Sequence, residues 1–108
     1  EHTSAMVQKA QQLILQYYDQ GITLEEIAGK LVVSEEYLST QFKKETGMTF
    51  SETVRKYRIE KVKKLLLETP FKLNQIAELA GYSDSKYMSK VFKEEVGMLP
   101  SEYRKSLH

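Results

Sequence analysis

The chain has 108 residues, of which 41% are hydrophobic and 29% are charged, and it contains no cysteine. These values are typical of one compact globular domain or of two small subdomains. The lack of cysteine excludes a disulfide framework and a thiolate metal site. No apolar run exceeds three residues, which is too short for a membrane-spanning helix.

The formal net charge is only +1, so a function that depends on charge must depend on where the charges lie. The first residue is Glu1 rather than Met, and we therefore expect a fragment of a longer protein with a tag remnant at Glu1-His2. No stretch shows the alternation of a β-strand, and only five glycines and two prolines interrupt the chain. This pattern predicts an all-α fold.

Residues 4–31 are expected to form two helices. Apolar residues recur at helical spacing over residues 4–19, and Gly21 ends this first helix. Thr23 and Glu26 have the spacing of a capping box, in which each residue binds the backbone N–H of the other. The box predicts a second helix that ends near Leu31.

A third helix is expected over residues 34–46, with Ser34 as its N-cap. With about 100° between successive residues, Leu38 and Phe42 lie on one side of this helix. The opposite side is polar and consists of Glu36, Ser39, Thr40 and Lys43. Such a face is often merely solvated. That interpretation stays open here, because Glu35 and Glu36 would repel a phosphate.

A long helix is expected over residues 50–68, opened by a capping box of Thr49 and Glu52. Six positive charges fall within ten of its residues: Arg55, Lys56, Arg58, Lys61, Lys63 and Lys64. We expect Arg58 to pack its stem against the core and to pair its head with an acid from another helix. Phosphate contact is the minority interpretation for this arginine.

Three further helices are expected after the long one. The first covers residues 73–80, and after a short turn the second covers residues 83–96. Pro100 opens a short last helix, because proline is tolerated at the first helical position. Ser83 and Ser101 are interpreted as helix caps rather than as nucleophiles.

The helix over residues 83–96 has a basic outer face. Met88 and Phe92 form its apolar side, and the residues that face outward are Lys86, Ser89, Lys90 and Lys93. Three lysines on one face are more than an ordinary solvated surface, and they favour an anionic partner.

The two halves of the chain repeat one another. The offset is 49 residues before the turn of the second helix pair and 50 after it, so one residue is inserted near Ser85. Two helices joined by a short turn form a helix-turn-helix, and a tandem pair favours duplex DNA as the partner. The 19 residues of the long helix span about 28 Å, close to the roughly 34 Å of one duplex turn. Thirteen residues are identical to their counterparts in the second half: Leu24, Ile27, Ala28, Ser34, Tyr37, Ser39, Phe42, Lys43, Glu45, Gly47, Met48, Ser51 and Glu52.

Other chemistry has little support. The only histidines, His2 and His108, lie at the two ends, no histidine and carboxylate share metal-ligand spacing, and no glycine-rich loop follows a strand. We therefore expect no catalytic residue, no metal and no cofactor. The tyrosines are spaced as core residues rather than as a platform for stacking single-stranded bases. They are Tyr17, Tyr18, Tyr37, Tyr57, Tyr82, Tyr87 and Tyr103.

Over about residues 8–106 the chain resembles the AraC-type transcriptional regulators. The stretches that carry this resemblance include residues 24–28, 34–39, 42–47, 58–59, 65–66, 76–82 and 100–104. The resemblance implies a fold of seven helices, with helix-turn-helix subdomains at residues 1–49 and 69–108 joined by a linker helix at 50–68. It also implies a missing N-terminal domain for effector binding, phosphorylation or dimerisation. The arrangement is similar to the output domains of response regulators in this family.

The resemblance also implies roles for individual residues. The base-reading positions fall at Glu36, Ser39, Thr40, Ser85, Lys86, Ser89 and Lys90, and the phosphate-facing ones at Lys43, Lys72, Lys93 and Arg55. Many family members have a large or basic residue where Glu36 and Thr40 stand, which weakens the expected base readout by the first unit. Lys72 replaces the usual capping residue, at a cost of roughly 0.5–2 kcal/mol of helix stability.

We therefore interpret the chain as the DNA-binding domain of a cytoplasmic transcriptional regulator. The helices at 34–46 and 83–96 are expected to enter successive major grooves of double-stranded DNA. RNA polymerase is expected as a further partner. The alternative is a helical protein-interaction module that uses the acidic face of the first unit, and an enzyme is a distant third.

Overall fold

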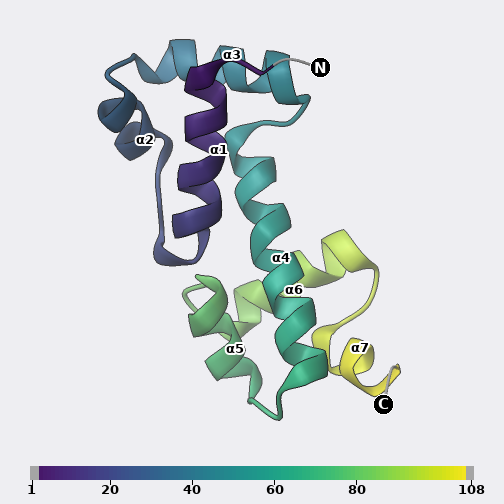
Figure 1. The fold of residues 1–108 in the computed structure, drawn as a ribbon. Coiled ribbons are helices and arrows are strands. Elements are labelled where there is room, and N and C mark those ends of the chain that lie inside the picture. The colour runs from purple at the N-terminus through teal and green to yellow at the C-terminus, as the bar shows by residue number, and fades with distance from the viewer. Residues whose placement is uncertain (1–2, 107–108) are drawn as a thin grey trace. The chain divides into compact units, whose positions relative to one another are not determined.

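The computed structural model describes residues 3–106, which fold into seven α-helices and one short 3-10 helix, with no strand among them (Figure 1). The elements are α1 (Ala5–Tyr17), the 3-10 helix η1 (Tyr18–Gln20), α2 (Leu24–Leu31), α3 (Glu35–Thr46), α4 (Phe50–Glu68), α5 (Leu73–Ala80), α6 (Ser85–Val96) and α7 (Pro100–Ser106). The predicted all-α fold with a long fourth helix is confirmed. His2 and His108 lie outside the described residues. None of the described helices is long and apolar enough to cross a membrane.

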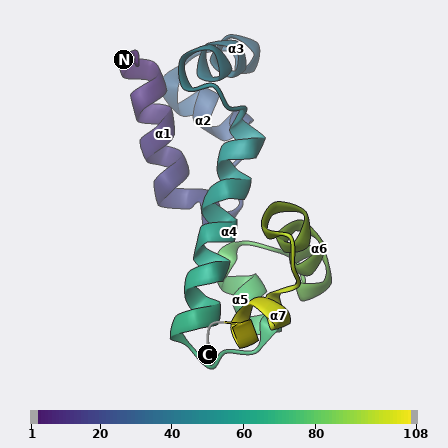
Figure 2. The same ribbon diagram turned by 90° about the vertical axis from the view of Figure 1, so that its right-hand side faces the viewer.

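The chain divides into two compact units, residues 1–57 and 58–108, and the boundary falls inside α4. In the first unit α1, α2 and α3 all pack against one another (Figure 2). The start of α4 contributes one buried side chain, Val54, to their common core, and Phe50 and Tyr57 pack against it. The buried residues of this core are Val7, Ala10, Ile14, Ile27, Ala28, Leu38, Phe42 and Val54.

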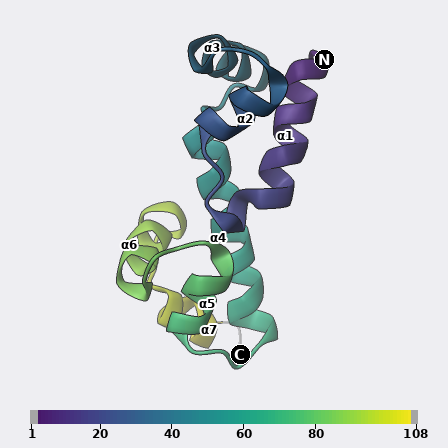
Figure 3. The same ribbon diagram turned by 90° about the vertical axis from the view of Figure 1, so that its left-hand side faces the viewer.

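The second unit has its own core. Here α5 packs on α6 and α6 on α7 (Figure 3), and the rest of α4 supplies three buried side chains. The buried residues of this core are Ile59, Val62, Leu66, Ile76, Ala77, Ala80, Tyr82, Met88, Val91 and Phe92. Each unit therefore encloses one helix-turn-helix, α2–α3 or α5–α6, with a hydrophobic core of its own.

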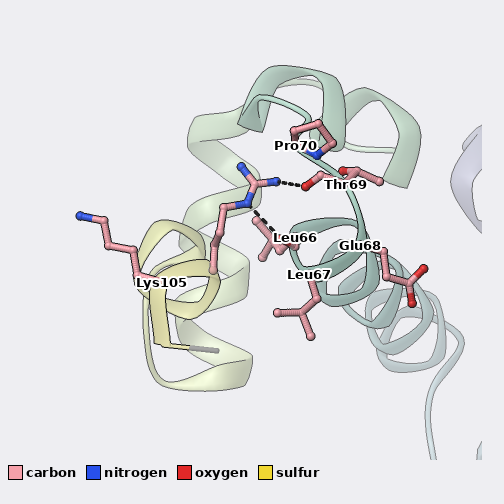
Figure 4. A pocket seen from close by; sticks show the side chains of 7 residues that line it. Leu66, Leu67, Glu68, Thr69, Pro70 and Lys105 are labelled. Carbon is pink, nitrogen blue, oxygen red and sulfur yellow. Dashed lines mark hydrogen bonds between the residues drawn. The ribbon is translucent and has the colours of Figure 1, made fainter. Parts of the chain in front are cut away.

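In the second unit, Arg104 of α7 closes the C-terminal end of α4. Its Nε donates to the carbonyl oxygen of Leu66 at 3.0 Å, and a terminal nitrogen of the guanidinium donates to that of Thr69 at 3.1 Å (Figure 4). The last carbonyls of a helix have no partner within the helix. The arginine supplies two of the missing donors, and Pro70 follows directly, where the helix cannot continue.

Three predicted N-terminal caps are confirmed. The hydroxyl of Ser34 accepts a hydrogen bond from the N–H of Tyr37 at 3.1 Å. Thr23 and Glu26 form both hydrogen bonds of a capping box, at 3.1 Å and 2.9 Å. The second predicted box, which opens α4, forms its two hydrogen bonds at 2.9 Å and 3.0 Å.

The predicted cap at Ser83 is wrong. α6 begins at Ser85, and its cap is Asp84, whose Oδ1 accepts from the N–H of Tyr87 at 2.7 Å. Asp84 follows Ser34 by 50 residues, so the inserted residue lies in the turn before the cap. The turn buries Tyr82 in the core and leaves Ser83 exposed, one residue too early to cap the helix.

The predicted cap at Ser101 is also wrong. α7 begins at Pro100, so Ser101 lies within its first turn. The side chain of Glu102 instead accepts from the N–H of Leu99 at 2.8 Å. The first N–H groups of a helix have no partner within it, and proline has no N–H to leave unpaired. The helix therefore starts at Pro100, one residue before the serine.

The two helix-turn-helix turns differ at the end of their first helix. Val32 ends α2 with φ 58° and ψ 48°, the left-handed conformation, and its counterpart Gly81 ends α5 with φ 96°. Val32 is the one residue other than glycine with positive φ among the described residues. For a β-branched residue this conformation is unusual and costly, whereas glycine adopts it freely.

We expect Val32→Gly to stabilise the protein. The left-handed conformation costs an L-residue roughly 1–2 kcal/mol, and the extra freedom of glycine in the unfolded chain offsets about 0.4–1 kcal/mol of that gain. The net increase in the free energy of unfolding is expected to be about 0.5–1 kcal/mol, measured by urea denaturation. The matched change Gly81→Val should lower the same free energy by about 1 kcal/mol or more. A Val32→Gly variant that is less stable than the parent chain would contradict the backbone strain that we assign to Val32.

Candidate nucleic-acid interface

The outward face of α3 matches the predicted one. Leu38 and Phe42 are buried in the first core, each with 1% of its surface exposed. All four residues predicted on the opposite side are exposed: Glu36, Ser39, Thr40 and Lys43. Lys43 is not freely extended, since its Nζ donates to the carbonyl oxygen of Gly47 at 3.2 Å, at the end of its own helix.

The outward face of α6 is basic. Met88 and Phe92 are fully buried, together with Val91, which the helical pattern did not single out. The exposed positions opposite them are Lys86, Lys90 and Lys93. None of the three ammonium groups forms a hydrogen bond or an ion pair with another described residue. The helix therefore presents three positive charges that no acid within residues 3–106 neutralises.

The start of α6 is joined to α5 by a hydrogen bond between side chains. Ser85 is half-buried, and its hydroxyl donates to Oδ1 of Asn74 at 2.7 Å. Ser85 was predicted to read a base, but its hydroxyl proton is already used in this hydrogen bond. Its oxygen can still accept a hydrogen bond from a base, next to the amide group of Asn74. Sequence reasoning missed Asn74, because a helical wheel drawn for α6 alone contains no residue of α5. Ser89, one turn further along, is also half-buried.

The remaining predicted phosphate contacts lie outside α3 and α6. Lys72 is exposed at the N-cap position of α5, and its N–H donates to the side chain of Gln75 at 3.1 Å. Its ammonium has no acceptor atom, so only half of a capping box forms there. Arg55 is half-buried on α4 and already has an interaction within the protein. Lys72 is therefore the more available of these two cations.

Arg58 contacts an aromatic ring in the second unit. Its guanidinium carbon lies 5.5 Å from the centre of the ring of Tyr82, at the distance of a cation–π contact. Tyr82 in turn meets the ring of Tyr87 edge-on, with the centroids 6.0 Å apart. The predicted packing of the Arg58 stem agrees with its half-buried side chain. The aromatic contact was not expected.

The first turns of the two outward-facing helices differ in charge. Glu35 and Glu36 lie in the first turn of α3, whereas the only carboxylate at the start of α6 is its cap, Asp84, which accepts a backbone hydrogen bond, and Lys86 follows it. Acidic residues favour the positive end of the helix dipole, but they also repel an approaching phosphate. The second unit therefore has the more favourable electrostatics for an anionic partner.

Two carboxylates near the end of α3 have lowered pKa values. The backbone N–H of Ser4 donates to Glu45 at 2.6 Å and is the main reason that the pKa of Glu45 lies below its ordinary value. The backbone N–H of Thr49 does the same for the pKa of Glu52, at 2.9 Å. Both carboxylates are therefore held in the charged form. No group of three or more potential metal ligands occurs among the described residues.

A helix-turn-helix domain family matches residues 27–106 of the chain, three quarters of its length, from within α2 to the end of α7. The chain belongs to the AraC-type family of helix-turn-helix transcriptional regulators. Members of this family bind DNA and regulate transcription rather than catalyse reactions.

The AraC-type domain is similar to proteins from several bacteria. It is 40% identical over 87 residues to the HTH-type transcriptional regulator YtdP of Bacillus subtilis, covering 81% of this chain and 11% of YtdP. The C-terminal domain of AraT, a response regulator from Geobacillus stearothermophilus, superimposes with a TM-score of 0.94 at 38% identity, covering 98% of this chain and 88% of that one. The C-terminal domain of the response regulator yesN from Fusobacterium nucleatum gives 0.83 at 37% identity, covering 90% and 96%. The AraC-type chain spans between 11% and 38% of the length of the first curated relatives that it matches.

The lowered pKa values predict how stability depends on pH. A carboxyl group whose pKa is lower in the folded state stabilises the protein above its ordinary pKa, and this contribution disappears as the pH falls through the folded value. We therefore expect the free energy of unfolding to fall as the pH drops below the ordinary pKa of glutamate. Denaturant unfolding across that range should show a smaller decrease for Glu52→Gln than for the parent chain. An identical pH dependence in the two proteins would contradict the assignment.

Proposed function

We propose that the chain binds duplex DNA as the DNA-binding domain of a transcriptional regulator, and that α3 and α6 insert their outward faces into the major groove. The observation that carries this proposal is the basic face of α6, with three exposed ammonium groups that have no acidic partner among the described residues. Amino groups of this kind bind the phosphates of DNA and the acceptor atoms of guanine.

The residues divide into two roles. We assign base contacts to the outward face of each helix and phosphate contacts to the cations that flank it. The base-facing set is Glu36, Ser39, Thr40, Ser85, Lys86, Ser89 and Lys90. The phosphate-facing set is Lys43, Lys72, Lys93 and Arg55. Arg55 and Lys43 would have to exchange a contact within the chain for a phosphate, so we rank them below the two exposed lysines of the second unit.

The second unit is proposed to supply most of the affinity. Lys86 and Lys90 can donate to guanine O6 and N7, whereas Ser39 and Thr40 are short and Glu36 is acidic. Glu36 can still accept a hydrogen bond from the amino group of cytosine, which would confine the first unit to particular sequences. The first unit would then contribute more to specificity than to affinity.

The full-length protein is proposed to contain a further domain that controls this one. The two similar solved structures described above are C-terminal domains of response regulators. A receiver domain that is phosphorylated is therefore the first candidate, ahead of an effector-binding or dimerisation domain. We also propose RNA polymerase as a protein partner, and the cytoplasm as the location because bacterial DNA is there.

We expect salt to weaken DNA binding strongly, and Lys86→Ala to weaken it more than Thr40→Ala. Each phosphate that a cation neutralises contributes about −0.9 to the slope of log K against log salt. If Lys86 reads a base, its loss should cost about 1–3 kcal/mol and relax specificity at one position. Fluorescence anisotropy titrations of the parent chain and both variants at several salt concentrations measure both effects.

Lys56→Ala is the matched control, because Lys56 is an exposed lysine on α4 outside both outward-facing helices. It should change the affinity less than Lys86→Ala does. A larger effect of Thr40→Ala than of Lys86→Ala would reverse the ranking of the two units. An affinity for DNA that does not change with salt, together with binding of a protein through α3, would favour the alternative of a protein-interaction module.

We further propose that one chain binds a single asymmetric site, with both units on the same duplex. The two reading helices are joined head to tail by the uninterrupted helix α4, so no dimer is needed to supply the second one. Inserting about five base pairs between the two half-sites turns them to opposite faces of the DNA, since one turn is about 10.5 base pairs. Affinity should then fall to that of the second unit alone.

A third duplex carries an insertion of about ten base pairs. This insertion returns the two half-sites to the same face of the DNA but leaves them farther apart than in the parent duplex. If neither insertion changes the affinity, the units do not bind DNA together. Gel-shift titrations of the three duplexes decide between these outcomes.

A further inference from the structure

Two of the seven tyrosines are exposed, contrary to the prediction that all seven are core residues. Tyr37 has 54% of its surface exposed and Tyr87 51%, whereas the other five are buried or half-buried. An exposed aromatic ring gains little from the hydrophobic effect. The prediction failed because each tyrosine lies about 100° from the buried residue that follows it, Leu38 or Met88, and so stands outside the apolar side of its helix.

The two exposed tyrosines occupy the same place in the two units. Each is the third residue of an outward-facing helix, and the backbone N–H of each donates to the helix cap, Ser34 or Asp84. The cap binds the backbone, so any residue except proline could stand there. The side chain is nevertheless tyrosine in both units, although the neighbouring positions differ: Glu36 corresponds to Lys86, and Thr40 to Lys90.

Most other identities between the units have a cause within the fold. Phe42 and Phe92 are buried, and Gly47 and Gly97 have positive φ. Neither explanation applies to a half-exposed tyrosine at a position that needs only a backbone N–H. The repeated tyrosine therefore points to a ligand that both units share.

Helix geometry indicates which part of that ligand each hydroxyl meets. At 100° per residue, Tyr37 and Tyr87 lie about 60° from Thr40 and Lys90, at the edge of the base-facing side. When a helix lies in the major groove, the middle of its outward face meets the base edges. Residues at the edge of that face meet the groove wall, which is formed by the sugar-phosphate backbone.

We propose that the hydroxyls of Tyr37 and Tyr87 each donate a hydrogen bond to a backbone phosphate of the DNA, on the wall of the groove that their helix occupies. This inference rests on the proposed function and adds two positioning contacts to it. A tyrosine hydroxyl is a neutral donor, so it fixes the register of the helix without adding charge. The contact is expected to strengthen binding to every sequence alike.

In the second unit, neighbouring side chains hold the ring of Tyr87 in place. The ring of Tyr87 meets Tyr82 edge-on at 6.0 Å between centroids, and Tyr82 is 7% exposed. The guanidinium of Arg58 lies 5.5 Å from the centre of the same Tyr82 ring. The ring of Tyr87 thus rests on a residue that is itself fixed, and little side-chain freedom remains to be lost on binding.

The test compares Tyr87→Phe and Tyr37→Phe with the parent chain in anisotropy titrations on a specific and an unrelated duplex, at three salt concentrations. Phenylalanine keeps the ring, and circular dichroism with a melting curve verifies the fold. Each variant should bind both duplexes about 10- to 100-fold more weakly, as for the loss of one hydrogen bond to a charged group. The salt slope should not change, because a neutral donor releases no counterion. Tyr17→Phe, on α1, is the matched control and should bind like the parent chain.

Three results would overturn the proposal. Unchanged affinity in both phenylalanine variants would remove the hydroxyls from the interface. Weakening by Tyr87→Ala but not by Tyr87→Phe would show an apolar contact of the ring instead. A loss of affinity for only one of the two duplexes would show that the hydroxyl recognises a base instead. If the parent chain itself binds no DNA, the proposed function fails as well, and that result differs from all three.

Discussion

The burial of one apolar side of α3 and of α6 is the constraint on which the remaining features of both units depend. Phe42 and Phe92 fill equivalent places in two separate cores, with Leu38 and Met88 one turn before them. A helix fixed by such residues cannot rotate about its axis without exposing an aromatic ring, which would cost several kcal/mol. The polar side of each helix is therefore held toward solvent by packing that no DNA is needed to complete.

Most of the fold could be predicted from the sequence, because local signals set the ends of the helices. The capping box at Thr23 and Glu26 and the glycines that end α3 and α6 act over a few residues, and a reader of the sequence can find them. The cap of α6 could not be chosen correctly in this way. Ser83 and Asp84 are both good caps, and the burial of Tyr82, a tertiary effect, decides between them.

The candidate site was predictable only where a single helix defines it. The helical wheel separates the polar from the apolar side of α3, but it contains no information on contacts between helices. The hydrogen bond of Ser85 to Asn74 and the edge-on contact of Tyr87 with Tyr82 join residues of different segments. The left-handed Val32 was missed for another reason: the usual marker of that conformation is a glycine, and the first unit has none at this position.

The contact of α7 with the end of α4 has a consequence for synthesis on the ribosome. Residues 1–57 contain a complete core, which can close while the rest of the chain is still being made, since domains generally fold in order of emergence. The second core is completed later, because Tyr103 of α7 packs edge-on against Phe92 at 5.4 Å and Arg104 donates to the carbonyl oxygens of Leu66 and Thr69. The more basic of the two outward-facing helices is therefore the later one to gain all of its packing contacts, which include the ring of Tyr103 against Phe92.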